Sequence, residues 1–359
     1  MLIAVLFIYR GVTKRNSWCS KTKIPSKINE RRINRIERMT SNNTTGGINE
    51  VTPEPPFVWY WALRGVLCFL SVSGNGSIIY LISTRTRLQN TTNWLTLSLA
   101  VADFLIGAAV IPSSFVCYFL IWCDWYAINR IFKYLFFVSI ANLCILTIDR
   151  YMAVIYPFKY YLLKRNKTRL RLVSGGWLIP AIIALIPFSW ENFSKDKYDS
   201  AWQVFLAIET VVLIVLPCAL MLIAYGRIWR VTHRQARAIE SHDQDIYRSR
   251  ERKTFTRVRR EGRSSLRVYG LLVVLFVACW SLSGYRYVCT AFRLRRISDI
   301  VTALSRLLML CNSAVNFLVY ACFKRDIQLE IKKCLQGIVL WQVNQVNETP
   351  SNYPAESVT

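Results

Sequence analysis

The chain has 359 residues, of which 53% are hydrophobic and 13% aromatic, and its mean hydropathy is +0.27. This composition excludes an ordinary soluble domain of that length and favours a protein that crosses a membrane several times. The formal net charge of +25 is also typical of nucleic-acid-binding proteins, but the basic residues lie between long apolar runs and not in one patch, which indicates a polytopic membrane protein.

The first 38 residues do not fit the rest of a membrane protein. Residues 1–9 are apolar, but they are too few to span a bilayer and have no basic flank before them, so they make a poor signal peptide. Residues 10–38 are strongly basic and should resist translocation. We therefore expect translation to start at Met39, so that 1–38 is absent from the mature protein. The remainder of the 1–57 segment is then an extracellular tail with glycosylation sequons at Asn42 and Asn43.

Seven apolar segments follow, each long enough to cross the roughly 30 Å of a bilayer core. They lie near 58–83, 93–119, 126–149, 172–190, 202–226, 267–290 and 298–322. These segments predict an all-α membrane protein with a seven-helix transmembrane domain over 58–322. Lysine and arginine gather after the first, third, fifth and seventh segments, which places the N-terminus outside the cell and the C-terminus inside. Asn192 then lies in an outer loop and is a third candidate for glycosylation.

Beyond the last span, residues 323–335 form an amphipathic pattern with Ile327, Leu329 and Ile331 among charged residues. This pattern predicts a short eighth helix on the inner leaflet, followed by a cytoplasmic tail over 336–359. Cys334 at its end is a candidate for palmitoylation, and an unmodified thiol is the equal alternative. Seven further cysteines fall inside the apolar segments, where a thiol behaves as a small hydrophobic group. They are Cys68, Cys117, Cys144, Cys218, Cys279, Cys311 and Cys322.

Polar side chains inside a membrane are costly, so each one in a span indicates a function. In chain order these landmarks, with the tryptophans and the proline that accompany them, are Gly74-Asn75, Asp103, Asp149-Arg150-Tyr151, Trp177, Pro217 with Tyr225, Phe276 with Trp280, Asn312-Ser313 and Asn316 with Tyr320. The set resembles the rhodopsin-like (class A) G protein-coupled receptors over about residues 58–335. Any single motif is weak evidence, but landmarks on seven successive spans are specific.

The resemblance implies a plasma-membrane receptor, not an enzyme, that binds an extracellular ligand and activates heterotrimeric G proteins through outward movement of helix six. Arg150 would pair with Asp149 in the silent receptor and swing toward the G protein in the active one. A simple snorkelling arginine is the alternative. The other residues implied in coupling and switching are Tyr151, Tyr225, Tyr320, Asn316, Trp280, Phe276, Ile140 and Pro217.

The carboxylate of Asp103 is buried in the second span and needs polar neighbours or a cation. In the resembled family such a cluster binds an allosteric sodium ion that favours the inactive state. The residues implied here are Asp103, Ser139, Asn312, Ser313 and Asn316, with Asn75 nearby. A purely structural hydrogen-bond network is the alternative, and no other cofactor is expected.

The chain lacks two prolines that the family pattern has and that loosen a helix. Leu282 stands where helix six normally has a proline, and Phe317 stands where helix seven has one, so hinge-like motion should be shallower. Gly262 occupies the position of the usual acidic partner of Arg150, and Glu261 is one residue off. We expect high basal activity, and a weakly signalling or decoy receptor is the alternative function.

The family's outer disulfide is also expected to be absent. Trp125 holds the position of the helix-three cysteine, and the 190–202 loop contains no cysteine. Cys123 could pair with Cys289 instead, but geometry decides such pairings.

The ligand pocket differs from that of the amine receptors, because Phe132 stands where they carry an aspartate. An atypical amine-like receptor is therefore a further alternative. The candidate pocket residues are Asn129, Phe132, Lys133, Phe136, Glu209, Tyr285, Arg286 and Arg306. Their basic character favours an anionic or carboxylate-bearing ligand. An internal pair between Lys133 and Glu209 is the alternative to that interpretation.

Three rival classes are disfavoured by the sequence. A retinal-binding light sensor needs a lysine in the last span, and 298–322 has none. A transporter should show internal repeats or broken helices at the midplane. A soluble enzyme needs a catalytic constellation, and the only histidines, His233 and His242, lie in a cytoplasmic loop. The expected partners are therefore a G protein, an extracellular ligand and membrane lipids, and no nucleic acid.

Overall fold

The computed structural model of the chain describes residues 57–119, 125–163, 166–187, 195–242, 249–292, 294–295, 297–334 and 336. The candidate glycosylation sites Asn42, Asn43 and Asn192 lie outside these residues, as does the expected start at Met39. Within the described ranges the chain forms helices and short turns but no strand.

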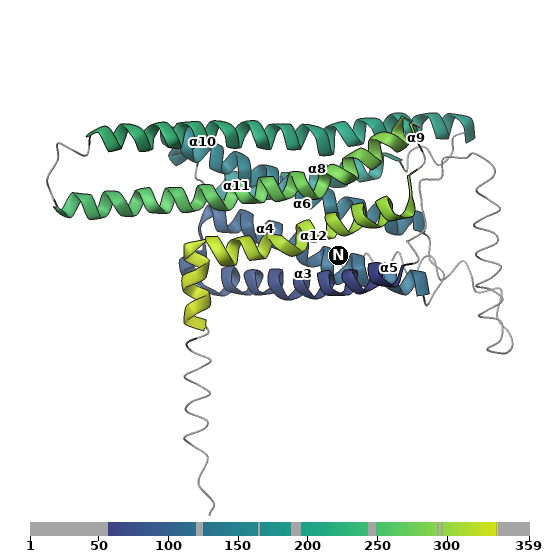
Figure 1. The fold of residues 1–359 in the computed structure, drawn as a ribbon, viewed down its shortest axis with the longest axis horizontal. Coiled ribbons are helices and arrows are strands. Elements are labelled where there is room, and N and C mark those ends of the chain that lie inside the picture. The colour runs from purple at the N-terminus through teal and green to yellow at the C-terminus, as the bar shows by residue number, and fades with distance from the viewer. Residues whose placement is uncertain are drawn as a thin grey trace, which may run out of the picture. The chain divides into compact units, whose positions relative to one another are not determined.

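Seven membrane-spanning helical segments are present, as the hydropathy pattern predicts. They are α3 (Val58–Thr84), α4 to α5 (Thr91–Leu105 and Ile111–Phe119), α6 (Trp125–Ile155), α8 (Asn166–Leu185), α9 to α10 (Lys195–Thr210 and Leu216–His242), α11 (Ser249–Ala291) and α12 (Asp299–Phe323). Two short helices, η2 (Thr86–Leu88) and α7 (Pro157–Leu163), lie in the connections. The fold is therefore a seven-helix bundle (Figure 1).

Side-chain caps fix two of the helix starts. The Asn90 side chain accepts a 2.9 Å hydrogen bond from the backbone N–H of Asn93, so α4 begins directly after it. The Ser298 hydroxyl accepts from the N–H of Val301 at 3.4 Å, and Asp299 places a negative charge in the first turn of α12. Both devices satisfy N–H groups that a helix start leaves without a partner.

Two spans contain one wider helical turn each, which the sequence did not predict. The π-helical turn η3 (Ile106–Val110) joins α4 to α5, and η5 (Val211–Val215) joins α9 to α10. An inserted residue of this kind rotates the faces of the helix before and after it. Asp103 precedes η3, and Glu209 and Pro217 flank η5, so these turns set the relative directions of three site residues.

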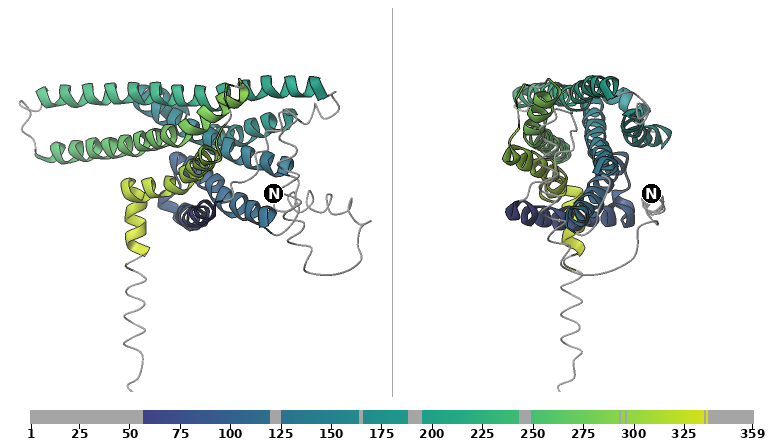
Figure 2. Two further views of the ribbon diagram at one scale, coloured as in Figure 1. Left: turned by 45° about the vertical axis from the view of Figure 1, so that its right-hand side comes forward. Right: turned by 90° about the vertical axis from the view of Figure 1, so that its right-hand side faces the viewer.

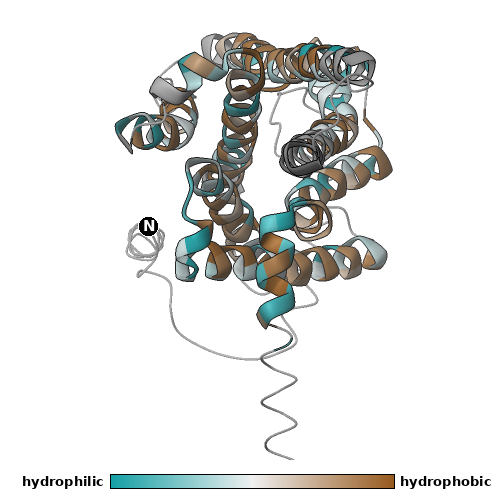
Figure 3. Ribbon diagram, turned by 90° about the vertical axis from the view of Figure 1, so that its left-hand side faces the viewer, coloured by the Kyte–Doolittle hydropathy of each residue, from teal (hydrophilic) through white to brown (hydrophobic). Residues whose placement is uncertain are grey.

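The helices pack around an interior that is apolar at its core. α12 packs against α11, α3 and α4, and α6 packs against α4, α8 and α10. The largest fully buried side chains include Trp280, Phe276 and Tyr320. Apolar residues also lie on outward faces, for example Ile182 of α8, which is 64% exposed. Figure 3 shows hydrophobic residues along much of the helical ribbon. Such a surface suits contact with lipid.

Two features distinguish the end of the bundle at which α10, α11 and the segment after α12 lie. Helices α10 and α11 continue side by side beyond the other helices (Figures 1 and 2). The helix over 325–334 turns sharply away from α12. Ile327 of this helix is fully buried, and Ile331 packs against the core, whereas Leu329 is 47% exposed. The expected short helix after the last span is therefore present, and Ile327 and Ile331 dock it on the bundle; its place on the inner leaflet stays a prediction.

Candidate functional site

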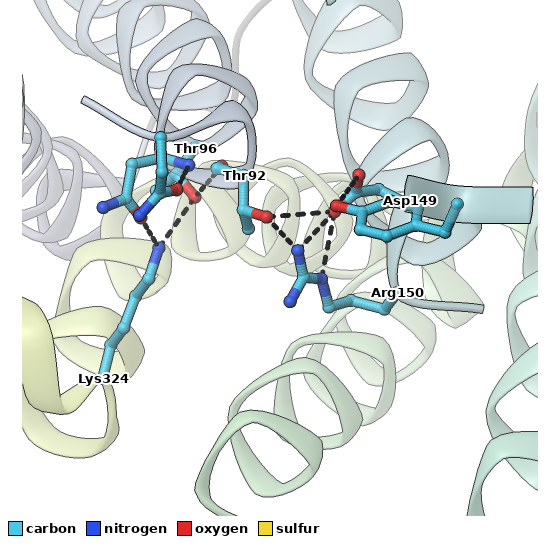
Figure 4. A network of polar contacts seen from close by, with 8 residues as sticks. Thr92, Thr96, Asp149, Arg150 and Lys324 are labelled. Atoms are coloured by element: carbon cyan, nitrogen blue, oxygen red, sulfur yellow. Dashed lines mark hydrogen bonds and ion pairs between the residues drawn. The ribbon is translucent and has the colours of Figure 1, made fainter. Parts of the chain in front are cut away.

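Arg150 is held at the end of α6 by its neighbour and by α4. Its Nε donates to Oδ2 of Asp149 at 3.1 Å, and its Nη2 donates to the hydroxyl of Thr92. The same Thr92 hydroxyl donates to Oδ2 of Asp149 at 3.2 Å. Figure 4 shows this closed triangle of guanidinium, carboxylate and hydroxyl. The expected local pair of Asp149 and Arg150 is therefore present, and a residue of α4 completes it.

Two tyrosines enclose this pair. The hydroxyl of Tyr160, on α7, donates to Oδ1 of Asp149 at 3.0 Å. Burial and the Asp149 carboxylate raise the pKa of Tyr160 above its usual value, so the phenol stays a donor. The guanidinium of Arg150 lies 5.1 Å from the ring centroid of Tyr269, on α11. Arg150 thus contacts helix six through the aromatic ring of Tyr269, whereas the sequence pointed only to an acidic partner near Glu261.

A second polar cluster lies beside the first, on the same face of α4. Nζ of Lys324 donates to Oδ1 of Asn93 and, at 3.2 Å, to the hydroxyl of Thr96. Asn93 donates through Nδ2 to Oδ2 of Asp326 at 3.0 Å. Burial lowers the pKa of Lys324, Asp326 and Asp149 oppose this, and Arg150 adds to it, so that the pKa is about 8. The cluster ties α4 to the turn that follows α12 (Figure 4).

The three tyrosines implied in coupling have other contacts here. The Tyr151 hydroxyl accepts from Nη1 of Arg227 at 3.3 Å. The Tyr225 hydroxyl lies against Gly270, where an added Cβ would come within 2.0 Å of it. Tyr320 is fully buried. In the described part of the chain, no hydrogen bond joins Arg150 to Tyr225 or Tyr320, and the guanidinium bonds to Asp149 and Thr92.

An aromatic chain runs from the middle of α6 to α11. The Phe136 and Trp280 rings meet edge to face at 6.1 Å, and the Phe276 and Trp280 rings lie 5.9 Å apart. Ile140, one turn along α6 from Phe136, is buried in the same core cluster. Pro217 is half-buried beside η5. The predicted switch residues Ile140, Phe276 and Trp280 and the predicted pocket residue Phe136 therefore belong to one packed core.

Asp103 is fully buried at the centre of a polar cluster. Its Oδ1 accepts from the Ser139 hydroxyl at 2.8 Å, and its Oδ2 accepts from Nδ2 of Asn316 at 2.7 Å. Asn75 links α3 to α12 by donating to the Ser313 carbonyl at 3.1 Å. Among the described residues, Oδ1 of Asn75 and Oδ1 of Asn312 are buried and receive no hydrogen bond. Buried oxygens and a carboxylate are the donor set that a hard cation prefers.

At the other end of the bundle, Lys133 and Glu209 form a buried ion pair. Nζ of Lys133 lies 3.2 Å from Oε2 of Glu209, so the internal pair given as an alternative from the sequence is present. The remaining predicted pocket residues differ in exposure. Asn129, Phe132, Arg286 and Arg306 are half-buried. Tyr285 is 44% exposed and accepts from Nη1 of Arg295 at 3.5 Å, so it is not gathered with the ion pair.

Two expectations about cysteine need correction. Cys289 is a free thiol, so the suggested bridge to Cys123 is wrong. Cys117 is disulfide-bonded to a partner outside the described residues, and it is therefore not simply a small hydrophobic group in a span. Cys334 is half-buried, and its sulfur accepts from Nη2 of Arg85 at 3.5 Å. Its lipidation stays a prediction.

The residues that complete both ends of the site were not predicted. They are Thr92, Asn93, Tyr160, Tyr269, Lys324 and Asp326 around Arg150, and Arg130, Trp202 and Tyr287 around Lys133. Helical spacing could have pointed to Tyr269, because it precedes Phe276 by seven residues and so shares its face of α11. The contacts of Thr92 and Lys324 join separate helices, and no local sequence pattern indicates them.

Comparison with known proteins supplies independent information. A family model described as the 7 transmembrane receptor (rhodopsin family) matches residues 74–320. The chain is 24% identical over 309 residues to an octopamine receptor beta-2R of Chilo suppressalis, covering 75% of this chain and 78% of that protein. It is 26% identical over 311 residues to an octopamine receptor beta-1R of Drosophila melanogaster, covering 76% of this chain but only 61% of that one. It is 25% identical over 318 residues to an alpha-1A adrenergic receptor of Oryzias latipes, covering 77% and 65%.

Proposed function

The chain belongs to the rhodopsin family of seven-transmembrane receptors, and from this premise we propose that it activates heterotrimeric G proteins through outward movement of α11. Membership makes it a multi-pass membrane receptor for an extracellular ligand, and not an enzyme. The basic connections described above support a plasma-membrane orientation with the N-terminus outside, so that Arg150 lies at the cytoplasmic end.

The contacts of Arg150 are the observation that carries this proposal. The guanidinium bonds to Asp149 of α6 and Thr92 of α4, and it lies over the Tyr269 ring of α11. Outward movement of α11 removes the ring that covers the guanidinium, and the long side chain can then extend toward a G protein. The same movement separates Gly270 from the Tyr225 hydroxyl, which frees Tyr225 to hold the extended arginine.

The aromatic chain offers a route from ligand to Arg150. Phe136 lies one turn from Lys133 on α6 and touches Trp280, whose neighbour Phe276 is buried in the core beside Ile140. A ligand that displaces Phe136 must therefore move Trp280 and α11. Because α11 is continuous past Leu282, we expect it to tilt as one piece and not to bend at a hinge.

We propose further that the Asp103 cluster binds an allosteric sodium ion. Asp103, Ser139, Asn312, Ser313 and Asn316 would hold it, and the ion would supply a positive charge that stabilises the buried carboxylate. The proposal is supported by the buried oxygens of Asn75 and Asn312, which receive no hydrogen bond among the described residues. Replacing sodium with N-methyl-D-glucamine should raise basal nucleotide exchange, and Asp103→Asn should abolish that response. Equal exchange in both salts would contradict the sodium site.

For the ligand, we propose a small molecule that carries a carboxylate or other anionic group. Lys133 supports this, together with Arg286 and Arg306, because cations at the mouth of a cavity attract anions. An amine is the second candidate, because the relatives above are named for octopamine or for adrenergic signalling. Phe132 argues against an amine ligand, because the ammonium of an amine needs a carboxylate at this position. Screening anionic and amine agonists on Lys133→Ala and Arg306→Ala variants separates the two: anionic agonists should lose potency, and unchanged potency would discard the anionic ligand.

A direct test of coupling is G protein nucleotide exchange with Arg150 intact and replaced. The proposal predicts exchange that depends on Arg150. A decoy receptor, the remaining alternative, predicts none in either case.

A further inference from the structure

The connection after α3 and the helix over 325–334 meet at one end of the bundle (Figure 1). Nη2 of Arg85 donates to Sγ of Cys334 at 3.5 Å, although the two residues are 249 positions apart in the chain. Nη1 of Arg87, in η2, lies 3.9 Å from Oε1 of Glu330. Basic side chains that follow the first span are therefore placed beside the helix that follows the last span.

One buried carboxylate holds two cations at this junction. Nζ of Lys333 lies 3.0 Å from Oε1 of Glu330, the oxygen that Arg87 also approaches. The Glu330 side chain is 7% exposed, whereas the side chains of Arg87 and Lys333 are 64% and 58% exposed. Ion pairs with exposed partners contribute little to stability, so the main effect of Glu330 is to fix where the two cations lie. Most of each cationic side chain stays accessible.

The charges of the two segments are strongly unbalanced. Residues 85–90 and 324–334 contain six cations and two anions. Lys324 and Asp326 both bond to Asn93 inside the bundle, and Glu330 is buried. The exposed charged residues of these segments are therefore all basic. They are Arg85, Arg87, Arg325, Lys332 and Lys333.

The neighbouring helices do not offset this charge. α3 has no charged residue over 65–84, and α4 has none before Asp103. Asp149 and Arg150, which both bond to Thr92 near the start of α4, pair with each other and add no net charge. An excess of positive charge therefore remains at this junction.

The junction lies at the boundary of the hydrocarbon core. The first span ends at Thr84 and the last at Phe323, directly before the two basic segments. Tyr80, one turn before the end of the first span, is 59% exposed, and Leu329 is 47% exposed. Tyrosine is common where a span meets the head groups of a membrane. The same two elements thus present exposed cations and exposed apolar side chains, which suits a lipid better than a free anion.

The chemistry of the basic side chains indicates the head group. An arginine guanidinium binds a phosphate through two parallel N–H donors, and a lysine binds one as a point charge. A phosphodiester carries a single negative charge, whereas a phosphomonoester carries about 1.5 to 2 and offers three acceptor oxygens. Arg85, Arg87 and Lys333 together therefore suit a head group with several phosphomonoesters. Basic clusters directly beside the cytoplasmic end of a span are typical of sites for phosphorylated inositol lipids.

We propose that Arg85, Arg87 and Lys333 bind the phosphomonoesters of a polyphosphorylated inositol phospholipid, with its acyl chains along α3 beside Tyr80. Glu330 stays behind the cations and orients them. The inference goes beyond the proposed signalling function, and it uses the same orientation, because anionic inositol lipids lie in the cytoplasmic leaflet. A bound head group bridges η2 and the helix over 325–334, so it should hold that helix on the bundle.

The test measures lipid binding without signalling. The purified full-length receptor is titrated in mild detergent with phosphatidylinositol bisphosphate, with phosphatidylserine of the same acyl chains, and with free inositol trisphosphate. Native mass spectrometry counts the molecules bound. We expect the bisphosphate lipid to bind about tenfold more tightly than phosphatidylserine or the free head group. Equal binding of phosphatidylserine would overturn the head-group assignment, and equal binding of the free head group would overturn the assignment of a lipid.

Variants locate the site. Arg87→Gln and Lys333→Gln should each weaken binding of the bisphosphate lipid about fivefold, and the double variant should weaken it about 30-fold. Lys333→Arg keeps the charge and should bind within about twofold of the parent. Lys159→Gln removes an exposed lysine from α7 and should change nothing.

Three results with these variants would contradict the assignment. They are full binding by the double Gln variant, equal weakening by Lys159→Gln, and loss of binding in Lys333→Arg. The first shows that the lipid binds elsewhere, and the second shows a general attraction between opposite charges. The third shows that the charge at position 333 is not what the lipid recognises.

Failure of this inference and failure of the proposed function are distinguishable. Nucleotide exchange that depends on Arg150 without selective lipid binding would remove this site and leave the receptor function. Selective lipid binding without nucleotide exchange would leave the site and remove the coupling.

Discussion

The ring of Phe317 on α12 occupies the space where a side chain at position 74 of α3 would lie. A Cβ added to Gly74 would come within 2.2 Å of Cδ1 of Phe317. Helix seven carries this phenylalanine where the family pattern has a proline, and glycine in the facing helix makes room for it. Helices one and seven are therefore packed by a ring against bare backbone, next to the Asn75 bond to Ser313.

Because of this contact, we expect a single methyl group added at position 74 to lower the stability of the receptor. Gly74→Ala should destabilise the receptor by about 1–3 kcal/mol, because overfilling a packed interior forces neighbours to shift. Gly65→Ala on the same helix is the matched control, since nothing lies within 4 Å of its added Cβ. Thermal unfolding in detergent checks both. Equal melting temperatures for the two variants would contradict the close contact, and Gly74→Ala with Phe317→Ala should recover part of the loss.

The buried ion pair predicts an asymmetry between single and double replacement. Lys133→Met alone should cost about 3–5 kcal/mol, because it leaves the Glu209 carboxylate buried without a cation. Lys133→Met combined with Glu209→Leu should return stability to within about 1 kcal/mol of the parent. Thermal unfolding of the three proteins measures this. Additive losses in the double variant would show that the two side chains do not form a pair.

Because Lys324 is buried, we expect the stability of the receptor to depend on pH. The pKa of Lys324 is about 8 in the folded receptor, against 10.5 for an unperturbed lysine. Between these values the unfolded chain binds a proton that the folded one does not, so stability should rise as the pH increases from 8 to 10.5. Below pH 8 both states are protonated, and the contribution of this group is constant. Melting temperatures over that range should rise less in Lys324→Met than in the parent, and identical slopes would refute the assignment.

We expect the Thr92 hydroxyl to hold basal signalling down. It accepts from Arg150 and donates to Asp149, so Thr92→Val should loosen the arginine and raise ligand-free nucleotide exchange several-fold. Thr91→Val is the matched control, because Thr91 makes none of these bonds. Basal exchange at matched surface expression is the measurement. A variant indistinguishable from the control would show that Thr92 does not restrain Arg150.

The sequence predicts the bundle well because each span is long, apolar and separated from the next by charged loops. It also predicts the pairing of Asp149 with Arg150, which is local. The sequence does not predict the contacts between helices. The stacking of Arg150 on Tyr269 and the tie from Lys324 to Asn93 depend on the rotation of each helix about its axis, which hydropathy does not specify. The π-helical turns near Asp103 and Glu209 change that rotation within a span, and no residue pattern marked them in advance.

Coupling through Arg150 is tested most directly by ligand-free nucleotide exchange on purified G protein, using membranes that hold the parent receptor, Thr92→Val, or Thr92→Val with Arg150→Ala. Surface expression is matched by antibody labelling. The parent should exceed membranes from mock-transfected cells, Thr92→Val should exceed the parent, and Arg150→Ala should return exchange to the mock level. Exchange by the parent no higher than mock, or exchange that survives Arg150→Ala, would contradict the proposed coupling.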